Sequence, residues 1–330
     1  MQVTIQPFRS EQMDELLAFL KKWSPTHPEL GEGSIIRWQK CHQHIAMVDN
    51  RIVGYIAQIP HEFHYGKPSN RSGGEQIGWG VTFVVDTSDN EIRKQAGRGL
   101  LTVIENSPPM KYTGVGMVAG VDQVYIRRGH VIRKDSVKMY GRFFKPTRAL
   151  KYLGKSTKLA PAIKLANFVF PAQTKVNADS VTKFEAFLPE WDTKWDELLS
   201  ERYELYGIRD AVYLNYKLSQ PNREYFCYRF GIDGYLIFRR ARNDLRDLTI
   251  VKVCDLVGTE KAKAALLPVA MRYAIEHRVD GILAISSVVD EPLYKSDGMF
   301  IARPYPIMMS PTIKVKMHVS FFDSDMDNLW

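Results

Sequence analysis

The apolar residues near the start of the chain switch between strand-like and helix-like spacing. Residues 3–5 form a short β run, and Ser10 can cap the helix that follows. The apolar positions of that helix keep a period of 3.6 residues: Met13, Leu16, Leu17 and Leu20. Two further apolar runs, 44–48 and 51–59, flank an Asp-Asn dipeptide and predict a β-hairpin.

A strand that runs into glycines and then into a helix follows the hairpin. The apolar run 81–85 is followed by Gly97 and Gly99, where a helical pattern opens. A strand, a glycine turn and a helix N-terminus aim unpaired backbone N–H groups and the positive end of the helix dipole at one point. The pattern predicts a phosphate-binding corner.

Two common phosphate motifs do not fit this corner. A dinucleotide fingerprint needs a third glycine where Thr102 stands, and a P-loop needs Gly-Lys followed by Ser or Thr. A Gly-Lys-Ser-Thr string does occur at 154–157, but Ala149 occupies the position of its first glycine and no β run precedes it. We interpret that string as linker, so neither NAD nor ATP is indicated.

The glycine run resembles the acyl-CoA-binding motif of the GNAT acyltransferases, R/Q-x-x-G-x-G/A. Lys94, Gly97 and Gly99 occupy its fixed positions, with Lys94 in place of the usual Arg or Gln. The resemblance implies that the CoA diphosphate is held by Lys94, Gln95, Ala96, Gly97, Arg98 and Gly99. It also implies that the preceding strand, at Phe83, Val84 and Val85, carries a bulge that opens its backbone to the pantetheine arm and the acyl carbonyl.

A second stretch resembles the family motif Y-x-x-x-G-F. Tyr125 and Gly129 match it, and His130 replaces the aromatic residue. The resemblance implies that Tyr125 lies on a short helix and faces the CoA sulfur. A phenol with a pKa near 10 is a suitable acid for a thiolate leaving group. For the base that deprotonates an acceptor amine, His61, Glu62 and His64 follow the hairpin strand, and a chain of waters is the alternative.

The second half of the chain repeats the first in outline. Gly54-Tyr55-Ile56 is echoed by Gly234-Tyr235-Leu236, and a strand at 248–256 again precedes a helix at 261–275. Between them, residues 258–264 contain no G-x-G and include an acidic residue, so this turn is not expected to hold a diphosphate. We predict an α/β fold, with mixed α+β sheets, made of two tandem GNAT-like domains. These are an acyl-CoA-binding domain at 1–145, a basic linker at 146–180 and a degenerate, acceptor-binding or supporting domain at 181–330.

Composition adds little to this prediction. The chain of 330 residues is 45% hydrophobic and 12% aromatic, enough to bury two cores. Cys41, Cys227 and Cys254 are an odd number of widely spaced cysteines without a C-x-x-C pair, so the sequence supports neither a disulfide framework nor a zinc site, and no metal is expected. No apolar run approaches 18 residues and no signal sequence is recognisable, so we expect a cytoplasmic protein without a membrane span.

The net charge of +8 is concentrated in the linker. Residues 144–178 contain no acidic residue and seven basic ones: Lys145, Arg148, Lys151, Lys155, Lys158, Lys164 and Lys175. The apolar positions there predict a partly helical segment packed across both domains with its lysines in solvent: Leu150, Leu153, Leu159, Ile163, Leu165 and Phe168. The alternative is contact with a membrane surface. Nucleic acid is not expected as a partner, because the basic residues are not interleaved with aromatics.

The acceptor is suggested by a further resemblance. Residues 209–217, followed by Pro221 and 225–229, are similar to a stretch of GNAT-like proteins found with bacterial surface-polysaccharide genes, as is the acidic end at 323–327. The resemblance implies transfer of an acetyl or hydroxyacyl group to the amine of a dTDP-linked 3-amino-3,6-dideoxy sugar, in lipopolysaccharide O-antigen synthesis. The residues expected to bind this substrate are Arg209, Tyr213, Asn215, Tyr216 and Asp325.

Two other functions stay open at this point. A FemAB-like aminoacyltransferase has the same tandem architecture but takes its donor from aminoacyl-tRNA. A non-catalytic ligand-binding protein is the second alternative, supported by the degenerate second half. The sequence leaves open the acyl chain, the acceptor amine and whether the protein is a monomer or a homodimer.

Overall fold

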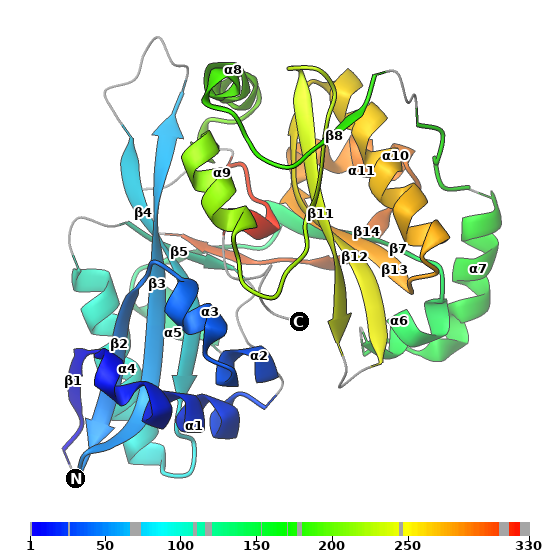
Figure 1. Cartoon of the computed structure of the whole chain (residues 1–330). Coiled ribbons are helices and arrows are strands. Elements are labelled where there is room, and N and C mark those ends of the chain that lie inside the picture. The colour runs from blue at the N-terminus through cyan, green and yellow to red at the C-terminus, as the bar shows by residue number, and fades with distance from the viewer. Residues whose placement is uncertain are drawn as a thin grey trace.

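The computed structural model describes residues 2–25, 27–66, 74–107, 111–115, 121–152, 154–169, 171–176, 180–243, 247–309 and 317–323. Its strands form two sheets that lie side by side, with helix α9 between them (Figure 1). The helices are α1 (Met13–Trp23), α2 (Pro28–Gly31), α3 (Ser34–Trp38), α4 (Asn90–Asn106), α5 (Val121–Arg127), α6 (Pro146–Tyr152), α7 (Ala160–Val169), α8 (Asp192–Arg202), α9 (Ala211–Leu218), α10 (Glu260–Glu276) and α11 (Glu291–Ser296).

The first sheet is built mainly from the first half of the chain. Across the sheet the strands are β1 (Thr4–Pro7), β2 (His42–Val48), β3 (Arg51–Tyr65), β4 (Glu75–Val85), β5 (Lys111–Val115), β15 (Ile307–Met309) and β6 (Val131–Arg133), and β9 (Leu205–Gly207) pairs with the end of β3. The predicted hairpin is confirmed, since β2 and β3 pair in antiparallel around Asp49 and Asn50. Both turn residues have positive φ, 48° and 60°, as a tight hairpin turn requires.

The second sheet is built mainly from the second half. Across it the strands are β14 (Phe300–Pro304), β7 (Val137–Phe143), β13 (Gly281–Ser287), β12 (Leu248–Gly258), β11 (Gly234–Asn243), β10 (Phe226–Arg229) and β8 (Thr182–Phe184). Its central part repeats that of the first sheet: an antiparallel pair, a helix of 17 residues, a parallel strand and a short helix. The predicted α/β fold with two related halves is therefore confirmed.

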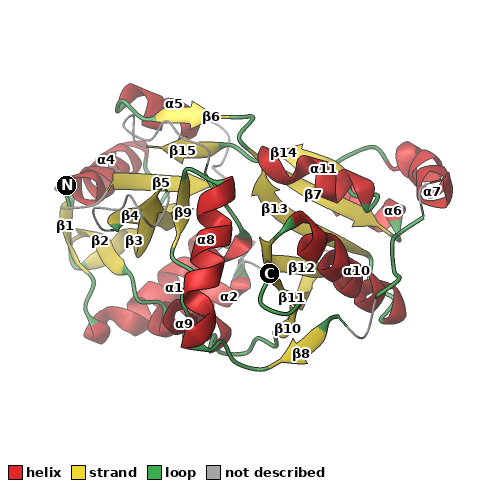
Figure 2. Cartoon of the chain, turned by 90° about the horizontal axis from the view of Figure 1, so that it is seen from above, coloured by secondary structure: helices red, strands yellow, loops and turns green. Residues whose placement is uncertain are grey.

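The halves exchange strands: the first half gives β7 to the second sheet, and the second half gives β9 and β15 to the first. β7, from the first half, lies between β13 and β14, whereas β15, from the second half, lies between β5 and β6 (Figure 2). The two insertions occupy equivalent positions, next to the parallel strand of each sheet. The sheets therefore do not divide the chain at residue 145, because a strand crosses in each direction.

The helices α1 and α4 cover opposite faces of the first sheet. Leu16, Phe19 and Leu20 of α1 pack with Tyr55 and Ala57 of β3 in one apolar cluster. On the other face, α4 buries a regular apolar stripe against β2 and β3: Ile92, Ala96, Leu100, Leu101 and Ile104. The helix at 13–23 predicted from its period of 3.6 residues is thus present, and its stripe is buried.

The predicted packing of the linker across both domains is wrong. Helices α6 and α7 lie at the outer edge of the second sheet, away from the first (Figure 1). Leu150 is buried there, but Leu165 and Phe168 are 63% and 83% exposed. The sequence period identified a helix correctly, but it could not tell which apolar residues find a partner.

Candidate functional site

The two central strands of the first sheet part beside an irregularity in β4. Within the described residues, the parallel pairing of β4 with β5 runs from Ile77 to Gly80 and ends opposite Gly114. In the pairing of β3 with β4, Gln58 faces Gly80 but Ile56 faces Phe83, so β4 contains one extra residue. The bulge expected on this strand is therefore present, but it lies just before Phe83 rather than at 83–85. A bulge leaves backbone groups outside the ladder and available to a ligand.

A buried polar cluster lies where the strands part. A side chain at Gly78 would collide with the Gln58 amide, and one at Gly80 would collide with the Tyr112 hydroxyl. The Tyr112 hydroxyl lies 3.2 Å from that of Tyr125 on α5. Gln58 is fully buried, and neither atom of its amide has a hydrogen-bond partner among the described residues. These glycines thus make room for polar side chains beside the bulge.

Tyr125 has the protonation state that an acid needs. Its side chain is 4% exposed, and burial raises the pKa of the phenol above its ordinary value of 10. Burial also raises the pKa of Tyr112, and its proximity to Tyr125 adds to that effect. Both phenols are therefore protonated at neutral pH, and one can pass a proton through the other.

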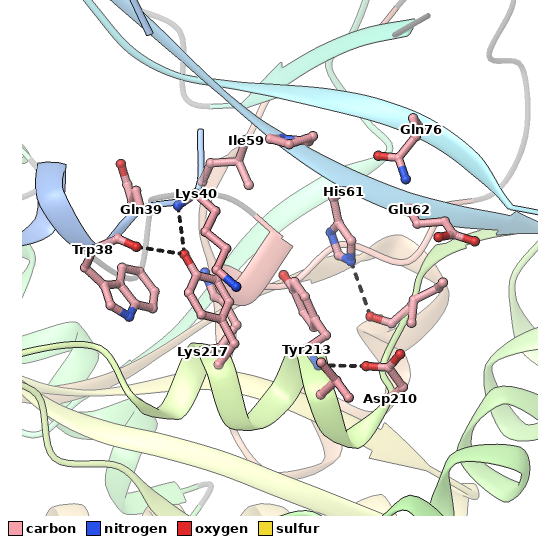
Figure 3. Close-up of a pocket in the computed structure, with 14 residues that line it drawn as sticks. Trp38, Gln39, Lys40, Ile59, His61, Glu62, Gln76, Asp210, Tyr213 and Lys217 are labelled. Carbon is pink, nitrogen blue, oxygen red and sulfur yellow. Dashed lines mark hydrogen bonds between the residues drawn. The ribbon is translucent and has the colours of Figure 1, made fainter. Parts of the chain in front are cut away.

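A cavity of about 350 Å³ lies between the halves of the molecule. It is enclosed by the end of β3, the residues after α3 and one face of α9 (Figure 3). Glu62 and Gln39 line it, together with the ring of Tyr216 and the ammonium-bearing side chains of Lys40 and Lys217. Gln39 is 6% exposed, and neither amide atom has a hydrogen-bond partner in the described part of the chain. We call this cavity the interdomain cleft.

His61 forms one wall of the interdomain cleft. Its ring stacks on that of Tyr213 at 4.2 Å, and its Nε2 lies 3.3 Å from the carbonyl oxygen of Ile208. A carbonyl only accepts, so Nε2 carries the proton and Nδ1 is left as an acceptor. Nδ1 lies 3.8 Å from the carboxylate of Asp323. Burial, aided by the nearby charge of Arg209, lowers the pKa of His61 to about 3, so the ring is neutral.

A buried ion network stands behind His61. Arg209 contacts Asp255 through Nε and Asp323 through Nη2, each at 2.7 Å, and all three side chains have no exposed surface. His318 lies within 4.0 Å of both carboxylates. Burial alone would raise the pKa of Asp323, but the adjacent Arg209 holds it below its ordinary value. The network fixes the C-terminal segment against the second sheet.

Comparison with known proteins identifies the fold. Neither a protein-family model nor a curated protein matches the sequence. Among solved structures, a GCN5-related N-acetyltransferase from Anabaena variabilis matches with a TM-score of 0.54 and 12% identity, over 93% of this chain and 72% of that one. Saccharomyces cerevisiae N-myristoyltransferase with bound myristoyl-CoA matches with a TM-score of 0.59 and 12% identity, over 93% and 82%. The fold is that of the GNAT acyltransferases.

The residues that resemble the GNAT glycine motif do not form the predicted turn. Gly97 and Gly99 lie inside α4, which begins at Asn90, and the predicted glycine turn is absent. Asp89 caps α4 and accepts hydrogen bonds from the amides of Glu91 and Ile92, at 2.8 and 3.0 Å, so a carboxylate already occupies this helix N-terminus. A glycine stands at 99 for packing, since a Cβ there would lie 2.7 Å from Ile5.

The other residues of that motif divide into two groups. Ala96 is fully buried in the core and is not accessible to a ligand. Lys94, Gln95 and Arg98 line an open groove of about 580 Å³ on the outer side of α4, beside Ile5. Any diphosphate contact on this GNAT-like helix would therefore come from side chains and not from turn amides.

The structure brings only part of the predicted acceptor site together. Tyr213 and Tyr216 line the interdomain cleft with His61. The prediction that Arg209 binds a diphosphate is wrong, because its guanidinium is buried between Asp255 and Asp323. Asn215 is also wrong, because its amide holds the backbone of Phe187 through two hydrogen bonds, at 2.9 and 3.0 Å.

One further expected residue, His64, does not line the cleft. The Nε2 of His64 lies 3.7 Å from the carboxylate of Glu62. Its Nδ1 lies 3.2 Å from Asp196 on α8. Asp325 lies outside the described residues.

Several residues of the site were not predicted from the sequence. Gln58, Tyr112 and Gln39 belong to no motif, and they reach the site only through strand register and helix packing. The alternation of Gly78 and Gly80 along β4 is the signal that could have identified the first two, since glycines inside a strand often mark close approach. In the described residues, no group of three or more His, Cys, Asp or Glu could hold a metal ion.

Proposed function

We propose that this chain is an acyl-CoA-dependent N-acyltransferase. The acyl donor binds where β4 and β5 part, and the acceptor amine enters from the interdomain cleft. The observation that carries the proposal is the β4 bulge beside the hydrogen-bonded pair of Tyr112 and Tyr125, in a chain with the GNAT fold.

The donor half of the reaction follows from that cluster. Backbone N–H groups released by the bulge polarise the thioester carbonyl and stabilise the oxyanion that forms on it. When the carbon–sulfur bond breaks, Tyr125 gives its proton to the departing thiolate, and Tyr112 supports it through their hydrogen bond. Lys94 and Arg98, one turn apart on α4, are the proposed side-chain contacts of the CoA phosphates.

The acceptor half calls for an amine that loses a proton before it attacks. Among the predicted bases, His61 is neutral but its lowered pKa makes it a weak acceptor of an ammonium proton. Glu62 lines the same cleft with a side chain that is 43% exposed, and a carboxylate there attracts the ammonium and receives the proton. We assign this role to Glu62 and a positioning role to His61, which orders the wall against Tyr213.

The nucleotide-linked amino sugar remains one acceptor to test. Tyr213 and Tyr216 support it with aromatic surface, and Lys40 and Lys217 support an anionic group. Arg209 and Asn215, on which the hypothesis also relied, are committed to internal contacts. The acceptor class supported by the cleft is therefore a primary amine attached to an anionic or aromatic group.

Thermal unfolding measured with acetyl-CoA, longer acyl-CoAs and free CoA tests the donor assignment. A ligand at a hundred times its dissociation constant raises the unfolding free energy by roughly 2.7 kcal/mol, which a thermal shift detects. Tyr125→Phe is expected to keep this shift but lose turnover with amine acceptors. Lack of a shift with every CoA compound would overturn the proposal. A response to aminoacyl-tRNA alone would support the FemAB-like alternative.

A further inference from the structure

Helix α7 presents apolar side chains that are exposed in the described part of the chain. It follows α6 at the outer edge of the second sheet, on the side away from the interdomain cleft (Figure 1). Four large apolar side chains on and beside it are exposed by half or more: Leu159 (51%), Leu165 (63%), Phe168 (83%) and Val169 (56%). Leu165, Phe168 and Val169 have the i, i+3, i+4 spacing that places side chains on one face of a helix. Isolated exposed hydrophobic residues are ordinary, but a group of them on one helix face indicates an interaction site.

The helix is held in place by its other side. Ala160 is buried, and the amide of Asn167 donates a 2.7 Å hydrogen bond to the carbonyl oxygen of Phe143. Arg142, which is buried, donates to the carbonyl oxygen of Asn167 at 3.1 Å. The exposed apolar side chains thus stand on a fixed helix, whose orientation is set by β7.

The charge around α7 has one sign. Residues 144–178 contain no acidic residue. Lys145 and Arg148 pair with Asp280, but five exposed lysines have no acidic partner among the described residues: Lys151, Lys155, Lys158, Lys164 and Lys175. A helical segment that exposes both apolar side chains and lysines is complementary to an anionic bilayer, where the rings and aliphatic chains enter the headgroup region and the ammonium groups meet phosphates.

We propose that the α7 surface, defined by the four apolar residues and five lysines above, docks the protein on an anionic lipid membrane. A second copy of the chain is the less suitable occupant. In a twofold interface the same patch meets itself, so the five lysines of each copy would face those of the other without an acidic residue from this segment between them. The inference does not depend on the proposed acyl transfer.

Co-sedimentation of the full chain with vesicles tests this inference. We expect binding to vesicles that contain phosphatidylglycerol, weak binding to pure phosphatidylcholine, and a loss of binding as salt screens the lysines. Phe168→Glu is expected to weaken binding about tenfold or more, because it places a carboxylate among the exposed apolar side chains. Lys158→Glu with Lys164→Glu is expected to remove the preference for the anionic lipid.

A matched control is Ile232→Glu, which changes another exposed apolar residue, 54% exposed in the turn before β11, and is expected to bind like the unchanged chain. Circular dichroism verifies that each variant is folded. Equal binding of Phe168→Glu and the unchanged chain would overturn the inference, as would lack of binding to anionic vesicles. A dimer in solution that Phe168→Glu dissociates, without vesicle binding, would instead make this face an interface between copies.

Discussion

The imidazole of His61 lies flat against the ring of Tyr213, with centroids 4.2 Å apart and planes inclined by 17°. One residue comes from β3 and the other from α9, so this stack joins the two halves of the chain beside the interdomain cleft. Because the pKa of His61 is lowered to about 3 by burial, the stack contains a neutral ring at physiological pH.

That lowered pKa predicts a loss of stability on acidification. The unfolded chain binds a proton at this histidine below about pH 6.5, whereas the folded chain does so only near pH 3. The contribution is thus fully present above pH 6.5 and is lost as the pH falls toward 3. Urea unfolding at about pH 7.5 and at about pH 5 measures how much free energy of unfolding is lost on acidification. This loss should be about 2 kcal/mol smaller in His61→Gln than in the unchanged chain. If the unfolding free energy of both chains depends on pH in the same way, folding does not lower the pKa of His61.

Asp297 predicts the opposite dependence. Burial raises the pKa of this carboxyl to about 6, compared with about 3.9 in an unfolded chain, and its Oδ2 has no partner among the described residues. Ionisation therefore destabilises the fold, beginning above pH 4 and reaching its full effect above pH 6. Asp297→Asn should add roughly 2 kcal/mol at about pH 8 and almost nothing at about pH 4. Thermal melts at both pH values measure this, with Asp135→Asn, a change at an exposed residue, as the control.

The pair of Tyr112 and Tyr125 offers a test of the proposed acid. Tyr125→Phe should lower kcat by about a hundredfold, because the thiolate loses its proton donor, while the dissociation constant of CoA stays within a factor of about two. Tyr112→Phe should cost about tenfold. Each single change leaves a buried hydroxyl unpaired and should lower stability by about 1–2 kcal/mol, whereas the double change should cost less than the two added together. Full activity in Tyr125→Phe would remove it from the mechanism.

Glu62 is expected to act on the acceptor and not on the donor. Glu62→Gln keeps the shape of the cleft but cannot take a proton, so kcat with an amine acceptor should fall by about a hundredfold or more. Affinity for acyl-CoA should not change, and activity should recover in part at higher pH, where more of the amine is already deprotonated. The matched control is Glu190→Gln, at an exposed residue that does not line the cleft. An unchanged pH profile would assign the proton transfer to another group.

The exchanged strands predict that the halves do not fold apart. A fragment of residues 1–145 retains β7 without its sheet and lacks β15 between β5 and β6, so it exposes strand edges on both sides. Neither this fragment nor 146–330 should give a cooperative thermal transition alone, while a mixture of the two should. A sharp transition in the isolated first fragment would show that the exchange is dispensable.

Local sequence patterns predict the main elements and the outline of the fold. The hairpin around Asp49 and Asn50 and the stripe of α1 depend on local spacing and turn chemistry, which act over a few residues. The repeated order of strands and helices predicted two related halves for the same reason, and the resemblance of two motifs predicted that they are GNAT-like. A bulge was expected on β4 from a motif, and the structure has it a few residues earlier.

Which side chains of the site can reach a ligand depends on the tertiary structure. The glycines at 97 and 99 have the spacing of a turn, but Asp89 caps the helix first and Ile5 takes the space beside Gly99. Arg209 has the chemistry of a phosphate ligand, yet two carboxylates from distant segments enclose it. Whether a side chain meets a ligand, an ion or the core depends on which distant elements pack beside it, and local sequence holds no record of those partners.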